Sequence, residues 1–322
     1  MNILVTGGCG FIGHNVVRFL EQQGHTCHII DSRTDYKFIP QDELNYLVSE
    51  RLKRINHAAH CADVRNAQLV DIMFRTVKPD VVIHLASFPR QKVVNENPSL
   101  ASEVMSTGLI NLLESAKNHG TNRFVYISSS MVYGDFNDDV KEDAVCNPQG
   151  QYGIMKLAGE WLVKDYSRRG YFDHVIVRPS AVYGELDVED RVVSKFMLAA
   201  MRGNTLKVNG ASEALDFTYV NDTAMGIVQA AVSNNASNKT YNITRGQSHS
   251  LLDAAKLIVD IAGKGTIDVR DKDINFPSRG ALNIDAARKD FSYDPKVDVR
   301  EGFQKYHNWL ASSTFWAEQL SK

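Results

Sequence analysis

The sequence predicts a doubly wound α/β fold, in which helices cover both faces of a parallel sheet. Short apolar segments alternate with segments of helical periodicity through the first 178 residues. The first apolar segment ends in a glycine-rich turn that opens a helix. Polar or small residues follow the later apolar segments, and in a parallel sheet such positions share the carboxyl edge, where ligands bind. These three observations predict a large domain with a ligand site at that edge.

The predicted strands and helices follow one another along this half of the chain. Strands are expected at residues 2–6, 27–30, 57–61, 81–86, 123–127 and 175–178. Helical periodicity covers residues 12–23 and 100–117. A helix is also expected at 152–168, and another near 42–53 within an irregular polar connection at 34–55. Because strands and helices alternate, we expect right-handed crossovers between parallel strands.

Beyond residue 185 the pattern changes, and the sequence predicts a smaller α/β lobe. Helices are expected at 192–201, 222–232, 251–262 and 299–309, and a further segment of the lobe at 279–291. Strands are expected at 206–208 and 241–244, and the second of these should return to the main sheet. We therefore expect a nucleotide-binding domain at 1–178, with 216–248 returning to it. Residues 179–215 and 249–322 would form the substrate-binding lobe.

Composition narrows the classes of partner. A formal net charge of −2 gives no reason to expect nucleic acid or an anionic membrane. No apolar run is long enough to span a bilayer, and we expect no signal peptide before the first strand. The four cysteines lack metal-ligand spacing, so free thiols in a cytoplasmic protein are expected, with no metal site.

The glycine-rich turn has the spacing of a dinucleotide-binding loop. Gly7, Gly10 and Gly13 follow a predicted strand and open a predicted helix. The first permits a tight turn, the second lets the backbone approach a pyrophosphate, and the third allows close packing of helix on strand. The amides and positive dipole at the start of the helix then favour the phosphates. Both flanking elements are predicted, so the motif indicates dinucleotide binding strongly.

The second strand ends in a carboxylate that indicates which dinucleotide is bound. Asp31 stands where an acidic side chain accepts hydrogen bonds from the adenosine ribose and repels a 2′-phosphate. This favours NAD over NADP. Arg33 weakens the preference, because an arginine nearby can accommodate that phosphate.

A tyrosine and a lysine on one helix face are the candidate catalytic pair. Tyr152 and Lys156 are four residues apart in the helix predicted at 152–168. A fixed ammonium favours the phenolate form of a neighbouring phenol. We therefore expect Tyr152 to transfer protons near neutral pH.

At this point the chain resembles, nearly end to end, the extended short-chain dehydrogenases/reductases of the NAD-dependent nucleotide-sugar epimerase/dehydratase type. The matching segments are 6–13, Asp63-Val64, 84–87, 128–134, Tyr152 with Lys156, 178–184 and 216–222. The resemblance implies a Rossmann domain, NAD as cofactor and a homodimer formed through the fourth and fifth helices. It implies cofactor contacts from Gly7, Gly10, Phe11, Ile12, Gly13, Asp31, Ser32, Arg33, Asp63, Val64, Leu85, Ala86, Ser87, Tyr152, Lys156, Pro179 and Val182.

The resemblance also assigns catalytic roles. Ser129 would hydrogen-bond the oxygen that becomes a carbonyl, Tyr152 would take the proton, and Lys156 would support both phenolate and ribose. In the family's dehydratases an acidic pair occupies the positions of Ser130 and Met131. Because methionine cannot transfer protons, a dehydratase is disfavoured. The resemblance therefore implies a nucleotide-sugar epimerase that acts through a keto sugar and tightly bound NAD. C4 is the sugar carbon expected to be inverted.

The expected substrate is a nucleotide-diphosphate sugar. Arginines suit a diphosphate, so Arg191 and Arg279 are candidate contacts, and Ser130 and Val208 complete the expected substrate site. Three positions depart from the family pattern: Leu215 replaces an arginine, and Ala181 and Met105 each replace an asparagine. Two alternatives remain, a sugar reductase, dehydrogenase or dehydratase of the same family, and a non-catalytic dinucleotide-binding protein.

Overall fold

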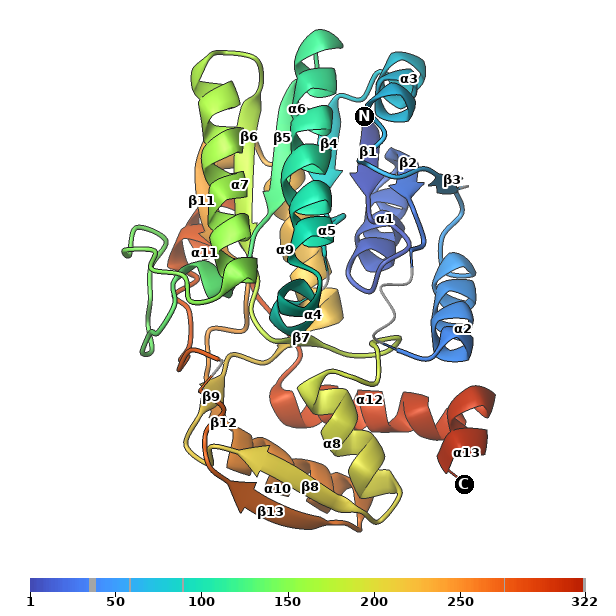
Figure 1. Ribbon diagram of the computed structural model, residues 1–322, viewed down its shortest axis with the longest axis vertical. Helices are drawn as coiled ribbons and strands as arrows, with labels where there is room; N and C mark the ends of the chain where they lie inside the picture. Colours follow the sequence, from blue (N-terminus) through green and yellow to red (C-terminus); the bar gives the residue numbers. More distant parts are fainter. Residues whose placement is uncertain (35–38, 58, 89, 275, 321–322) are drawn as a thin grey trace.

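The computed structural model describes residues 1–34, 39–57, 59–88, 90–274 and 276–320. A parallel sheet of seven strands forms its centre, in the order β11-β6-β5-β4-β1-β2-β3 (Figure 1). These strands are β1 (Asn2–Thr6), β2 (Thr26–Asp31), β3 (Ala59–Cys61), β4 (Val81–His84), β5 (Arg123–Ile127), β6 (Asp173–Arg178) and β11 (Lys239–Asn242). The chain runs outward from β1 in both directions, which confirms the doubly wound class.

Helices cover both faces of this sheet. Two large clusters of buried apolar side chains lie on opposite faces, because successive side chains of a strand point to opposite sides. One cluster includes α1 (Gly13–Gln22), α9 (Val220–Val232) and α11 (Asp285–Phe291). The other includes α3 (Ala67–Val77), α6 (Gly108–Asn118) and α7 (Gln151–Arg168), and Figure 1 shows α6 and α7 side by side.

A π-helical turn divides the helix expected at 100–117. It is formed by Glu103–Thr107 and lies between α5 (Pro98–Ser102) and α6, while the short α4 (Gln91–Glu96) precedes α5. The amide of Gly108 donates to the carbonyl of Glu103, the i to i+5 bond that defines this turn. The turn brings Gly108 so close to Val64 that an added Cβ would lie 2.6 Å from its Cγ2 atom.

The smaller lobe lies beyond the carboxyl edge of the sheet (Figure 1). It contains α8 (Val192–Met201), β8 (Thr205–Asn209), α10 (Leu251–Ala262), β13 (Thr266–Arg270), α12 (Val299–Ser312) and α13 (Thr314–Leu320). A third apolar cluster binds these elements together. Two short ribbons, β7 (Val182–Tyr183) with β10 (Thr218–Tyr219) and β9 (Ala214–Leu215) with β12 (His249–Ser250), connect lobe and domain.

Most predicted elements lie within a few residues of their expected positions. The helices expected at 192–201 and 251–262 have these bounds, and the Ser250 hydroxyl caps the second by accepting from the Asp253 amide at 3.0 Å. The strand expected at 241–244 is β11, which pairs with β6. The sequence reading did not predict α3, β13 or α13. It also did not predict that α11, within 249–322, packs on the sheet domain.

No helix among the described residues is long and apolar enough to cross a membrane. All four cysteines are free thiols.

Candidate active site

The glycine turn fits closely against the end of β4. Gly7 has φ +73°, and a Cβ there would lie 2.7 Å from the backbone nitrogen of Ala86. A Cβ on Gly13 would lie 2.1 Å from the carbonyl oxygen of Gly7, and one on Gly10 would lie 3.0 Å from it. Larger residues would fill this space, so the turn forms a cradle of bare backbone at the start of α1. Such a cradle fits the pyrophosphate of a dinucleotide.

A pocket of about 180 Å³ opens beside this turn. Ten of the predicted cofactor residues line it: Gly7, Gly10, Asp31, Ser32, Arg33, Asp63, Val64, Leu85, Ala86 and Ser87. Its other lining residues are Cys9, Ile30, Thr34, Leu44, Val48, Arg51, Ala62 and Val104. The helix α2 (Gln41–Leu52) supplies three of these, and no motif in the sequence had pointed to them.

The Asp31 carboxylate holds the turn and faces the pocket. One oxygen accepts from the amide of Cys9 at 2.9 Å, and the other accepts from the amide of Arg33 at 2.8 Å. Each carboxylate oxygen retains capacity for a further hydrogen bond, as an adenosine ribose would require. The Arg33 side chain donates to the carbonyl of Ala59 at 3.4 Å, across the neighbouring strand.

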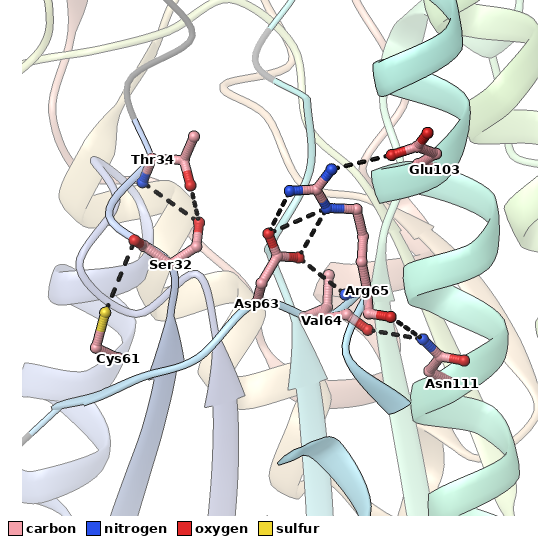
Figure 2. A network of polar contacts seen from close by, with 8 residues as sticks. All are labelled: Ser32, Thr34, Cys61, Asp63, Val64, Arg65, Glu103 and Asn111. Atoms are coloured by element: carbon pink, nitrogen blue, oxygen red, sulfur yellow. Dashed lines mark hydrogen bonds and ion pairs between the residues drawn. The ribbon is translucent and has the colours of Figure 1, made fainter. Parts of the chain in front are cut away.

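The part of the pocket after β3 is built on an ion-pair network (Figure 2). Arg65 clamps the carboxylate of Asp63 with its Nε atom at 3.0 Å and its Nη2 atom at 2.7 Å, and its Nη1 atom donates to Glu103 at 3.0 Å. This clamp holds the pKa of Asp63 below its usual value. The amide of the Asn111 side chain donates to the carbonyls of Val64 and Arg65, both at 3.0 Å. The loop after β3 is therefore fixed from α6.

The remaining predicted cofactor residues lie outside the pocket lining. Phe11, Ile12 and Gly13 continue from the glycine turn into α1. The carbonyl of Pro179 accepts from the amide of Ser130 at 2.9 Å, and Val182 belongs to β7.

The structure brings Ser129, Tyr152 and Lys156 together. The Lys156 ammonium is buried and donates to the carbonyl of Ile127 at 2.8 Å. It lies 5.8 Å from the centroid of the Tyr152 ring. The hydroxyl of Ser129 accepts from the amide of Met131 at 3.2 Å and lies close enough to the Tyr152 phenol to lower its pKa. A phenol, a hydroxyl and an ammonium thus share one site at the carboxyl ends of β4 and β5.

Burial opposes the charged forms of both Tyr152 and Lys156. It raises the pKa of Tyr152 above the ordinary value, and the Arg191 guanidinium and the nearby Ser129 hydroxyl lower it in part. Burial also lowers the pKa of Lys156 to about 7, while the Glu160 carboxylate raises it. The predicted support of the phenolate by Lys156 therefore has to act against the desolvation of both groups.

A buried ion pair stands behind Lys156, one helical turn along α7. Glu160 accepts from Arg178 at 2.8 Å and 2.6 Å and from the hydroxyl of Ser128 at 2.6 Å. Arg178 also donates to the Tyr133 hydroxyl at 2.9 Å. This network connects α7 to the ends of β5 and β6. Sequence reasoning missed it, because Glu160 and Arg178 resemble ordinary charged residues until the fold buries them.

The predicted substrate residues differ in placement. Arg191 precedes α8, close enough to Tyr152 to influence its pKa, and its Nε atom has no hydrogen-bond partner among the described residues. Arg279 likewise has an unpartnered Nε atom, and burial lowers its pKa to about 10. Ser130 is buried and donates to Ser180 at 3.0 Å. Val208 is fully buried in β8.

The three departures from the family pattern also have defined places. Ala181 has φ +37°, a conformation that an asparagine adopts more readily than an alanine. Met105 is buried within the π-helical turn, and Leu215 is buried in β9.

Comparisons with known proteins agree with this geometry. The family model described as the NAD dependent epimerase/dehydratase family matches residues 3–244. YtcB of Bacillus subtilis, named as a UDP-glucose epimerase, is 30% identical over 97% of this chain and 98% of its own. The solved structure of UDP-glucuronic acid 4-epimerase from Bacillus cereus, in complex with UDP-glucuronic acid and NAD, has a TM-score of 0.87. It is 26% identical and covers 96% of this chain and 98% of its own.

A dTDP-glucose 4,6-dehydratase of Escherichia coli is also similar, with 26% identity over 99% of this chain and 96% of its own. The chain belongs to the NAD-dependent epimerase/dehydratase family. Its cofactor is accordingly NAD, and the bare glycine cradle and the paired carboxylates at the ends of β2 and β3 fit that molecule.

Replacing Gly13 by alanine should abolish NAD binding. The new Cβ would meet a backbone oxygen at 2.1 Å, which the rigid turn cannot avoid. We expect a loss of about 1–3 kcal/mol in the free energy of unfolding, as for other overpacked sites. Calorimetric titration with NAD and chemical denaturation measure the two effects.

The matched control is Gly8→Ala, whose nearest contacts would be the Cγ2 and Cγ1 atoms of the buried Ile29 side chain, at 2.7 Å and 3.2 Å. A side chain can shift where the backbone oxygen that Gly13→Ala meets cannot, so we expect NAD binding to persist although the protein is destabilised. Equal loss in both variants would contradict the role given to Gly13.

Replacing Glu160 by glutamine should destabilise the protein by about 3–5 kcal/mol, because it leaves the buried Arg178 guanidinium without its counter-charge. Denaturant unfolding measures this loss. The double variant Glu160→Gln/Arg178→Met removes both charges and should recover much of it. A single variant as stable as the parent would show that the pair does not hold α7.

Proposed function

We propose that this protein is an NAD-dependent nucleotide-sugar epimerase that inverts the sugar at C4. The observation that carries the proposal is the joint placement of Ser129, Tyr152 and Lys156, with Met131 where a dehydratase needs a proton-transferring side chain. The 4-epimerases named among the relatives support the reaction type.

Each of the three side chains has a task that its position allows. Tyr152 takes the proton of the C4 hydroxyl, because its phenol is the titratable group that lies beside the Ser129 hydroxyl and the Lys156 ammonium. Ser129 donates to the C4 oxygen as that oxygen becomes a carbonyl. Bound NAD would supply the acceptor and donor for the hydride that leaves and rejoins C4. Lys156 keeps Tyr152 oriented and supplies positive charge beneath it.

The proton-transfer step requires a lower pKa of Tyr152 than burial alone leaves. Arg191 and Ser129 already act in that direction. The positive charge of the oxidised cofactor would act in the same direction, because an opposite charge favours the phenolate. Tyr152 is then a base when the oxidised cofactor is present and an acid once the positive charge is gone, as reversible inversion demands.

The substrate's diphosphate would be held by Arg191 and Arg279. The Nε atom of each has no hydrogen-bond partner among the described residues, although that of Arg191 lies 3.9 Å from the Asp187 carboxylate. One guanidinium group can donate two parallel hydrogen bonds to a pair of phosphate oxygens, which suits a diphosphate. Leu215 removes a third contact expected in the family, so these two arginines would carry the diphosphate between them.

Replacing Tyr152 by phenylalanine should lower turnover by at least about a hundredfold, the lower range for loss of a general acid–base group. NAD should bind as before. A panel of nucleotide sugars followed by NMR would show inversion at C4 with no net production of NADH. NADH accumulation would instead identify a dehydrogenase, loss of water from the sugar a dehydratase, and binding of NAD without turnover a non-catalytic protein.

Tyr166→Phe is the control for this substitution. Tyr166 lies on the same helix and donates to Glu114 at 2.5 Å, away from the site. Its variant should turn over normally. Near-normal turnover of Tyr152→Phe would remove that residue from catalysis.

We also propose a homodimer formed through α6 and α7. Three large apolar side chains on these helices are exposed: Ile110 by 40%, Ile154 by 52% and Trp161 by 65%. Ile154 and Trp161 are seven residues apart and share one face of α7. Exposed apolar residues gathered on neighbouring helices are typical of an interface.

Replacing Trp161 by glutamate should weaken the dimer by about tenfold or more, as loss of a buried aromatic anchor does. Sedimentation equilibrium measures the change. Val269→Glu is the control, because Val269 is 51% exposed on β13, in the smaller lobe. A parent protein that sediments as a monomer would exclude this assembly.

A further inference from the structure

The helix α2 lies between the cofactor pocket and the segment that leads to Arg191. Leu44, Val48 and Arg51 line the pocket and recur at helical spacing. A neighbouring face of the helix contacts the segment 184–191. There Leu47 packs with Leu186, and the amide of Glu189 donates to Glu43 at 2.7 Å.

Arg51 contacts both sides of this boundary. Its side chain is buried, with 4% of the residue exposed. Its Nη1 atom donates to the carbonyl of Cys9 in the glycine turn at 3.4 Å, and its Nη2 atom donates to the carbonyl of Leu186 at 2.7 Å. Its Nε atom has no partner among the residues that the structure describes. A guanidinium has five N–H donors, so capacity remains for an acceptor in the pocket.

Arg51 is a cation whose charged neighbours are mainly acidic. Asp31, Asp187 and Glu43 are the carboxylates that interact with it, and Asp187 and Glu43 are both almost fully buried. Burial lowers the pKa of Arg51 to about 10, so the guanidinium stays charged at neutral pH. Arg51 and Arg33 are the arginines that line the pocket, and Arg51 is the one whose side chain is buried, so a phosphate brought to the glycine turn would meet its guanidinium on this side.

This one side chain holds both Cys9, within the glycine turn, and Leu186, in the segment that follows β7. Leu186 has φ +66° although it is not a glycine, a conformation that costs free energy. The short hydrogen bond from Arg51 to its carbonyl helps to keep it there. Five residues later the same segment carries Arg191, the guanidinium next to Tyr152.

We propose that Arg51 is a positioning residue of the cofactor site, which binds the pyrophosphate of the dinucleotide and fixes the segment 184–191 at the same time. Occupation of the pocket then stabilises the position of Arg191 at the substrate site. Because such coupling is reciprocal, bound NAD tightens the binding of the substrate's nucleotide and the nucleotide tightens the binding of NAD. The part that concerns Arg191 rests on the proposed function, whereas the pyrophosphate contact does not.

The pyrophosphate contact is tested by calorimetric titration of nucleotide-free protein. Arg51→Met should weaken binding of both NAD and ADP-ribose by about tenfold or more, because each carries the pyrophosphate. Binding of adenosine, which lacks phosphate, should be unchanged. Arg51→Lys keeps the positive charge but replaces the planar guanidinium, which can donate to two acceptors at once, with a single ammonium. We expect its affinity for NAD and ADP-ribose to fall about threefold.

Lys53→Met is the matched control, since Lys53 immediately follows the same helix, is exposed, and pairs with Glu50 outside the pocket. It removes the same charge and should bind NAD as the parent does. Equal affinities for NAD in the parent and both Arg51 variants would overturn the proposal, as would equal losses in Arg51→Met and Lys53→Met. If Arg51→Met does not fold, Arg51→Lys decides alone: unchanged NAD affinity rejects the contact.

The coupling is tested by titrating UDP into the protein with and without NAD. In the parent, UDP should bind several-fold more tightly when NAD is present, and in Arg51→Lys this difference should shrink. If NAD tightens UDP binding by the same factor in the parent and in Arg51→Lys, the proposed link between Arg51 and Arg191 is rejected. If no nucleoside diphosphate binds to the parent at all, the proposed function fails, while the titrations with NAD and ADP-ribose still decide the pyrophosphate contact.

Discussion

A buried ammonium group is the constraint on which this site depends. Lys156 lies in the interior, where a charge without partners is costly. The carbonyl of Ile127, the faces of Tyr126 and Tyr152, and the carboxylate of Glu160 offset that cost. Each of these groups belongs to β5 or α7, so these two elements must pack against each other in one fixed alignment. The catalytic geometry is thus a consequence of accommodating one charge.

The two parts of the molecule are joined by buried polar groups as well as by apolar packing. Asp216 is fully buried in the segment that returns from the lobe, and burial raises its pKa to about 6. Its carboxylate accepts from the amides of Gly246 at 3.2 Å and Leu282 at 3.1 Å. Glu43 and Arg51 make similar bonds from α2 to the segment after β7. These bonds have direction, so they fix how the lobe is oriented over the sheet edge.

Local signals made most of the sheet domain predictable. The glycine turn, Asp31 and the helix bearing Tyr152 and Lys156 are each encoded within a short stretch, and the order of strands follows from the alternation. The contacts of α2 could not be predicted from local sequence signals. The helix was predicted at 42–53 and lies at Gln41–Leu52, but its amphipathic pattern is weak and does not show that Arg51 enters the pocket.

The same limit applies to the smaller lobe and to the electrostatics. Strand β13 is polar and pairs with β8 across more than fifty residues of sequence, a contact that no local pattern specifies. The clamp of Arg65 on Asp63 also depends on the arrangement in space, since Glu103 approaches from a different helix. The pKa of Tyr152 could not be inferred from its spacing to Lys156, because it also depends on burial and on Arg191, which the fold brings close.

The π-helical turn at Glu103–Thr107 carries one residue more than an α-helical turn would hold. It sets Val104 in the wall of the cofactor pocket and, directly afterwards, Gly108 against Val64 and Leu109 in the core. Loss of one codon from this stretch would restore a regular helix and rotate everything before it by about 100° relative to α6. The length of this stretch is therefore constrained together with its buried residues, Val104 and Met105.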